Sequence, residues 1–122
     1  MEYRRRFPNL PLTDEEIRAR RKQAKELLRE AGSALTAGAY DTAEKAFIGV
    51  ISLDEKNAAA YQGLGDVYFA EHQFTEARQT YRYAVFLDKR NEHALVRLAE
   101  IAEAEGALGT AVEYYQQAIL LN

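Results

Sequence analysis

Cysteine is absent from this chain of 122 residues, which excludes disulfide bonds, thiolate zinc sites and a cysteine nucleophile. Proline and glycine are sparse, with two and seven residues, as is typical of an ordered and mostly helical chain. The apolar runs are only a few residues long, so no membrane-spanning helix is predicted. No secretory signal is evident, because charge and proline follow Met1 rather than an apolar stretch. These absences lead us to expect a single cytoplasmic domain.

Charge is unevenly distributed along the chain, although the net charge is only −3. Residues 1–29 carry nine Lys and Arg against five Asp and Glu, whereas residues 30–122 carry seven against fourteen. An acidic body argues against a nucleic-acid partner, because affinity for phosphates rests on clustered Lys and Arg. Residues 1–12 are predicted to be an irregular basic arm in which Arg4, Arg5 and Arg6 could weakly contact anionic lipid; a solvated arm is the alternative.

The sequence repeats in frames that begin at Ala24, Ala58 and Glu92, a period of roughly 34 residues. A small residue recurs at one shared position, and an aromatic residue follows it four positions later; these are Ala43, Ala77 and Ala111, then Phe47, Tyr81 and Tyr115. Such a period is typical of a stacked array of helix pairs. We therefore expect packed repeats that present a surface to partners.

The boundaries of six helices can be predicted from caps and turns. Thr13 and Glu16 have the spacing of a capping box, and the helix that they open should end near Thr36, with Gly38 as a left-handed stop. The remaining helices are expected over residues 41–53, 58–71, 75–87, 92–105 and 109–121. His72 takes the turn position of Gly38 and Gly106, so we interpret it as a cap with positive φ. No strand is predicted.

The repeated residues resemble the tetratricopeptide repeat family. The middle repeat matches best, through Tyr61, Leu64, Gly65, Tyr68, Phe74, Ala77, Tyr81 and Ala84. Positions where the family often has Trp hold Leu27, Tyr61 and Leu95, and Glu55 and Lys89 replace its frequent Pro. The resemblance implies an all-α, right-handed superhelical stack of antiparallel helix pairs with an N-terminal helical extension. The domain would span residues 13–122, with repeats at about 24–57, 58–91 and 92–122.

Small residues also predict close helix packing on physical grounds alone. Ala31, Gly65 and Ala99 fall on the first helices of the pairs, where a small side chain lets two helix axes approach. The aromatic residues at the second repeated position would fill the gaps between pairs.

The family resemblance implies a function as a protein-interaction module or scaffold that binds a peptide in its concave groove. The first helices would line the groove with Lys25, Leu28, Leu35, Gln62, Asp66, Phe69, His93, Val96, Arg97 and Glu100. Leu28, Phe69 and Val96 offer apolar contacts, while the carboxylates favour a neutral or basic ligand. Solvated surface is the alternative interpretation of these residues.

One subclass of the family binds acidic chaperone tails through a clamp of Lys, Asn and Arg. The matching positions here hold Leu28, Gly32, Gly63, His93 and Arg97, so only the arginine is retained. Histidine is a poor substitute for lysine because it is largely neutral at pH 7. We therefore do not expect an acidic tail as the ligand.

No catalytic, metal or cofactor site is predicted. His93 and Glu100 share a helix face but supply at most two metal ligands, fewer than a zinc site needs. Ser33 and Ser52 do not lie in a nucleophile-elbow motif. The sequence therefore indicates a protein that is not an enzyme.

A second functional hypothesis is self-assembly. The third helix pair finishes at the end of the given sequence with no capping helix after it, so we expect Val112, Tyr115, Ile119 and Leu120 to be partly bare. They could pair with a second copy in a homodimer. Alternatively, the chain is a module of a longer protein, which could be membrane-anchored through a segment before the basic arm, with this part in the cytoplasm.

Overall fold

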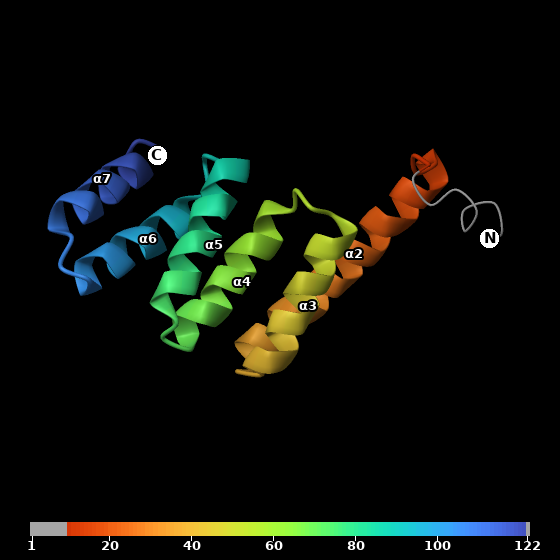
Figure 1. The fold of residues 1–122 in the computed structure, drawn as a ribbon, viewed down its shortest axis with the longest axis horizontal. Coiled ribbons are helices and arrows are strands. Elements are labelled where there is room, and N and C mark those ends of the chain that lie inside the picture. The colour runs from red at the N-terminus through yellow and green to blue at the C-terminus, as the bar shows by residue number, and fades with distance from the viewer. Residues whose placement is uncertain (1–9, 122) are drawn as a thin grey trace.

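The computed structural model describes residues 10–121, which form a row of three antiparallel helix pairs without a strand in that range (Figure 1). The helices, labelled as in Figure 1, are α2 (Asp14–Thr36), α3 (Tyr40–Leu53), α4 (Ala58–Ala70), α5 (Phe74–Leu87), α6 (Glu92–Ala104) and α7 (Leu108–Ile119). Each odd-numbered helix packs against the helix before it, and α3 and α5 also pack against the next pair. The predicted all-α stack of helix pairs is confirmed.

Side-chain caps begin the first helix of each pair. Thr13 and Glu16 form the predicted capping box, in which the backbone N–H of Glu16 donates to Thr13 Oγ1 at 3.1 Å and that of Thr13 donates to Glu16 Oε1 at 3.0 Å. Asn57 and Asn91, which occupy the same position in successive repeats, each accept a backbone hydrogen bond at 3.0 Å at the start of α4 and α6. The same chemistry thus sets the start of successive repeats.

The turn inside each pair has the same backbone conformation three times. Gly38, His72 and Gly106 have φ of 76°, 61° and 78°. After each of them, the backbone N–H of the next residue donates to a carbonyl five positions earlier, the pattern of a Schellman cap. The prediction that His72 occupies a cap position with positive φ is confirmed.

The core alternates small and large residues, as the repeat pattern predicts. Ala31, Ala43 and Ala77 are fully buried, and the Phe47 ring from α3 is 3% exposed. A Cβ atom on Gly63 of α4 would lie 2.2 Å from Phe47 Cζ, so the ring occupies the space that a side chain would need. Glycine at this position therefore allows α3 of the first pair to pack closely on α4 of the second.

Candidate functional site

The first helices α2, α4 and α6 carry the residues predicted to line the groove. Asp66 and Phe69 on α4 contact side chains of α6, whereas Leu28 and Leu35 on α2 are partly buried against the core of the first pair. Lys25 is exposed, and Gln62 and Val96 are partly exposed. Interactions between predicted groove residues are thus concentrated where α4 and α6 meet.

The Asp66 carboxylate joins three helices. The Tyr81 hydroxyl of α5 donates to Asp66 Oδ1, and His93 Nε2 of α6 lies 2.7 Å from the same oxygen. In a hydrogen bond to an ionised carboxylate, which only accepts, the donor is the Nε2–H group. The His93 side chain is 41% exposed and that of Asp66 is 20% exposed. Both side chains are therefore accessible to solvent, and the hydrogen bond between them fixes their relative orientation.

A cation–aromatic pair lies beside this cluster. The Arg97 guanidinium sits 4.5 Å from the centroid of the Phe69 ring, and its Nη1 donates to Glu100 Oε2 at 2.8 Å. Burial acts to lower the pKa of Arg97, but the contact with Glu100 outweighs it and the pKa is raised. Arg97 is thus paired within the chain and covers an aromatic surface.

Ionisation of the Tyr81 hydroxyl is linked to the stability of the fold. Burial and the hydrogen bond to Asp66 raise the pKa of the Tyr81 hydroxyl above its usual value of 10.0. Its contribution to folding is therefore fully present below pH 10 and is lost as the pH rises toward the folded-state pKa.

Replacing Tyr81 with phenylalanine should cost about 1 kcal/mol near pH 7, because one buried hydrogen bond is lost. Above pH 10 the wild-type free energy of unfolding should fall more steeply than that of the variant, by up to about 1.4 kcal/mol per pH unit. Urea unfolding across a pH series measures both. The other tyrosines are present in both the wild type and the variant. If the free energies of unfolding of the two proteins changed in parallel with pH, ionisation of Tyr81 would not be linked to folding.

Two tyrosine hydroxyls escaped the sequence prediction. From the sequence, Tyr81 is expected only to pack between pairs, and Tyr115 is expected both to pack between pairs and to be partly bare on the last helix. The Tyr115 ring is half-buried and its hydroxyl donates to Glu103 of α6, which raises its pKa to about 12. Tyr81 and Asp66 are 15 positions apart, and Tyr115 and Glu103 are 12 positions apart. These pairs lie on different helices, so the periodicity within one helix does not predict them.

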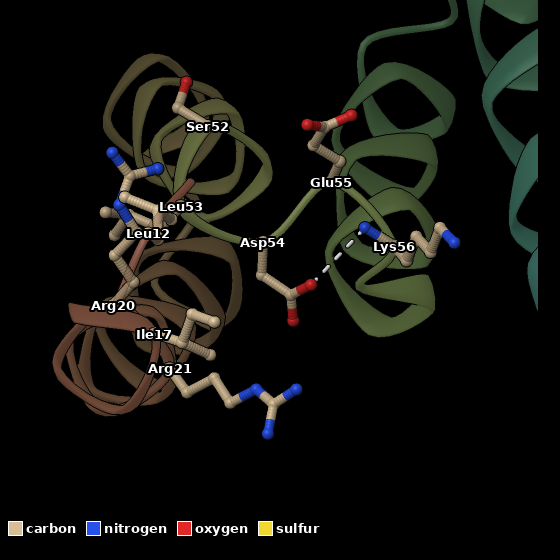
Figure 2. A pocket seen from close by; sticks show the side chains of 9 residues that line it. All are labelled: Leu12, Ile17, Arg20, Arg21, Ser52, Leu53, Asp54, Glu55 and Lys56. Atoms are coloured by element: carbon tan, nitrogen blue, oxygen red, sulfur yellow. Dashed lines mark hydrogen bonds between the residues drawn. The ribbon is translucent and has the colours of Figure 1, made fainter. Parts of the chain in front are cut away.

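A separate hollow lies at the beginning of α2, away from these contacts (Figure 2). Its volume is about 540 Å³, and Ile17, Arg20 and Arg21 line it together with residues 52–56. The Asp54 carboxylate there accepts a hydrogen bond from the backbone N–H of Lys56 at 3.4 Å, which stabilises the turn into α4 (Figure 2). Charges of both signs surround this hollow, so it favours neither an anion nor a cation.

The described residues contain neither a candidate membrane-spanning helix nor a candidate metal site. None of its helices is long and apolar enough to cross a membrane. Over residues 10–121, no group of three or more His, Asp or Glu side chains is arranged to hold a metal ion.

Two family models described as tetratricopeptide repeat match the chain, over residues 34–84 and 63–120. The overlap, residues 63–84, spans parts of α4 and α5, and the two matches together run from the last turn of α2 through α7. The chain belongs to the tetratricopeptide repeat family. No curated protein matches the sequence.

Solved structures of other tetratricopeptide repeat proteins are similar to this chain. The second repeat domain of Spaghetti (RPAP3), bound to the HSP90 peptide SRMEEVD, has a TM-score of 0.82 at 21% identity and covers 88% of this chain and 99% of its own. The Arabidopsis OM64 domain has a TM-score of 0.80 at 19% identity, with 84% and 85% covered.

A bacterial structure is also similar. The Yersinia enterocolitica type III secretion chaperone SycD, in complex with a peptide of the translocator YopD, has a TM-score of 0.78 at 25% identity. It covers 82% of this chain and 76% of its own. At these identities the likenesses concern the fold, which agrees with a tetratricopeptide repeat array.

Proposed function

We propose that this tetratricopeptide repeat protein is an interaction module that binds a peptide segment of a partner in its concave groove. The observation that carries the proposal is the adjoining pair of side-chain groups at α4 and α6, Asp66 with His93 and Phe69 with Arg97. They offer an apolar surface and fixed polar groups side by side, as a peptide site requires. Peptide complexes of the Spaghetti domain and of SycD support the same use of the fold.

The ligand that suits this groove is neutral to basic and partly apolar. Asp66, Glu100 and the neighbouring Glu103 of α6 outnumber the two cations Lys25 and Arg97, and Glu100 already pairs with that arginine. At the positions of the acidic-tail clamp, Gly63 is buried beneath the Phe47 ring and can offer no ligand contact. An approaching basic segment gains favourable long-range attraction, while the apolar side chains supply affinity.

Screening a library of displayed peptides against the immobilised protein tests the proposal. We expect enrichment of sequences that combine Lys or Arg with Leu or Phe. A Phe69→Ala/Val96→Ala variant should bind the selected peptides at least about tenfold more weakly, because central apolar contacts dominate interface energies. The exposed α7 variant Val112→Ala serves as a control and should retain affinity. Selected peptides that bind both variants equally would remove the groove as the site.

Self-association through α7 is the second candidate function. Val112, Ile119 and Leu120 are 52%, 68% and 82% exposed, as expected for a bare surface, whereas Tyr115 is half-buried. We propose that these side chains meet those of a second copy in a twofold dimer. Sedimentation at micromolar concentration tests this, and a strict monomer would exclude it.

The location of the protein in the cell, including any contact with a membrane, stays a prediction. Arg4, Arg5 and Arg6, which would contact anionic lipid or follow a membrane anchor, lie outside the described residues. The cytoplasmic location likewise rests on sequence composition alone.

A further inference from the structure

An aromatic surface built mainly on α5, with Tyr61 of α4 beside it, has no role in the proposed groove. The rings of Tyr61 and Tyr83 meet edge to face with centroids 4.6 Å apart, and those of Tyr83 and Phe86 stack at 5.8 Å. Phe86 is 71% exposed and Tyr83 is 43% exposed. A row of contacting aromatic rings in water is unfavourable on its own and is typical of an interaction surface.

Two hollows flank Phe86 on this side. The first, of about 500 Å³, is lined by Gln79, Arg82, Tyr83 and Phe86. The second, of about 370 Å³, lies among α5, α6 and α7 and is lined by Arg82, Val85, Phe86, Lys89, Leu98, Tyr114 and Gln117. Arg82 and Phe86 belong to both, so the exposed Phe86 ring borders both hollows. This shape can accept an apolar side chain on each side of the ring.

The charged side chains that line the two hollows have the sign opposite to the net charge of the body. Arg82 and Lys89 are the charged residues that line the two hollows, and both are cations. Residues 30–122 as a whole carry fourteen Asp and Glu against seven Lys and Arg. A local cationic and aromatic surface on an acidic body attracts carboxylates at this place and repels them elsewhere.

We propose that this surface, formed by Tyr83, Phe86, Arg82, Lys89 and Tyr114, docks an acidic and partly apolar segment of a partner protein. The apolar side chains of the segment pack on either side of Phe86, and its carboxylates face Arg82 and Lys89. This surface thus favours an acidic segment, whereas the groove is proposed to favour a neutral or basic one. Where the proposed groove is also used, the module binds two segments of opposite charge at two separate surfaces.

Nuclear magnetic resonance titration of the isotope-labelled chain with a synthetic probe tests this docking surface. The probe is the blocked peptide EEFEELE, and its counterpart KKFKKLK carries the same apolar residues with the charge reversed. At low salt we expect the acidic probe to shift the amide signals of residues 79–89 and 114–117 and to bind at least about fivefold more tightly than the basic one. Shifts confined to α4 and α6 would overturn the proposal.

Variants separate the contributions of ring and charge. Phe86→Ser should weaken the acidic probe about tenfold, and Arg82→Glu/Lys89→Glu should reverse the preference in favour of the basic probe. Ile48→Ser on α3 removes another exposed apolar side chain, 46% exposed, and should change nothing. Equal affinity of wild type and Phe86→Ser would contradict the site.

The groove and this surface can fail independently. Phe69→Ala/Val96→Ala, which tests the groove, should leave the acidic probe affinity unchanged within about twofold. Light scattering checks the competing occupant, a second copy of the chain. A dimer that Phe86→Ser converts to a monomer would assign the surface to self-association and overturn the partner proposal.

Discussion

Replacing Phe47 with alanine is expected to lower the free energy of unfolding by about 3–5 kcal/mol. The ring is 3% exposed and fills the space over Gly63, where α3 of the first pair meets α4 of the second. Its removal leaves a cavity that a glycine on the facing helix cannot fill. Because a domain of this kind has about 5–15 kcal/mol of stability in total, the loss is a large fraction of it. Urea unfolding followed by circular dichroism measures the change.

Phe86→Ala is the matched control for this substitution. The same atoms are removed from a side chain that is 71% exposed, so the expected change is within about 0.5 kcal/mol. Comparable losses in the two variants would mean that Phe47 is not the contact that joins the first pair to the second.

Replacing Gly63 with alanine is expected to destabilise the protein by about 2 kcal/mol, because the new methyl group overpacks the contact between α3 and α4. The added Cβ would lie 2.2, 2.3 and 2.9 Å from three atoms of the Phe47 ring, well inside van der Waals contact. Overpacking of this kind costs up to about 3 kcal/mol, and the better helix propensity of alanine recovers about 1 kcal/mol. Denaturant unfolding of the variant provides the measurement.

Gly32→Ala tests the same substitution without the overlap. A Cβ at Gly32, in the interior of α2, would meet nothing within 4 Å, so the variant should gain up to about 1 kcal/mol of stability. In a Phe47→Ala background, Gly63→Ala should become neutral or stabilising, because the ring that it overlaps is gone. The same sign for Gly32→Ala and Gly63→Ala in the wild-type background would contradict the packing described here.

The helices could be predicted because their limits are set by local chemistry. The capping box at Thr13, the asparagine caps and the positive-φ residues act within a few positions of one another, so a single sequence contains the whole signal. The six predicted helices agree with the structure to within about two residues at each end. The limits of the three repeats and of the basic arm remain predictions.

The sequence predicted which positions would line the groove, but not how their side chains would pair. The family resemblance placed Asp66, Phe69, His93 and Arg97 on neighbouring first helices, and the structure brings them into contact. How they pair depends on side-chain rotamers and on the distance between α4 and α6, which the period does not specify. The sequence therefore suggested free carboxylates, whereas Asp66 accepts from Tyr81 and Glu100 accepts from Arg97.

The aromatic surface gave no signal in the repeats, because its residues are not shared between them. At equivalent positions of the other repeats, Phe86 corresponds to Ser52 and Leu120, and Tyr83 corresponds to Gly49 and Gln117. On a single helix these residues cannot be distinguished from side chains that a neighbouring element would cover. Their exposure follows from the packing of α5 between α4 and α6, which only the three-dimensional structure shows.

The three first helices also limit how long a recognised motif can be. Helices that pack directly lie about 8–10 Å apart, so a groove across three first helices packed in this way would be roughly 20 Å wide. An extended chain advances about 3.3 Å per residue, so roughly six residues cross the groove from α2 to α6. The contacts at α4 and α6 occupy about half of that width. If the groove binds a peptide as proposed, the recognised segment is a short linear motif, of which about three consecutive residues contact α4 and α6.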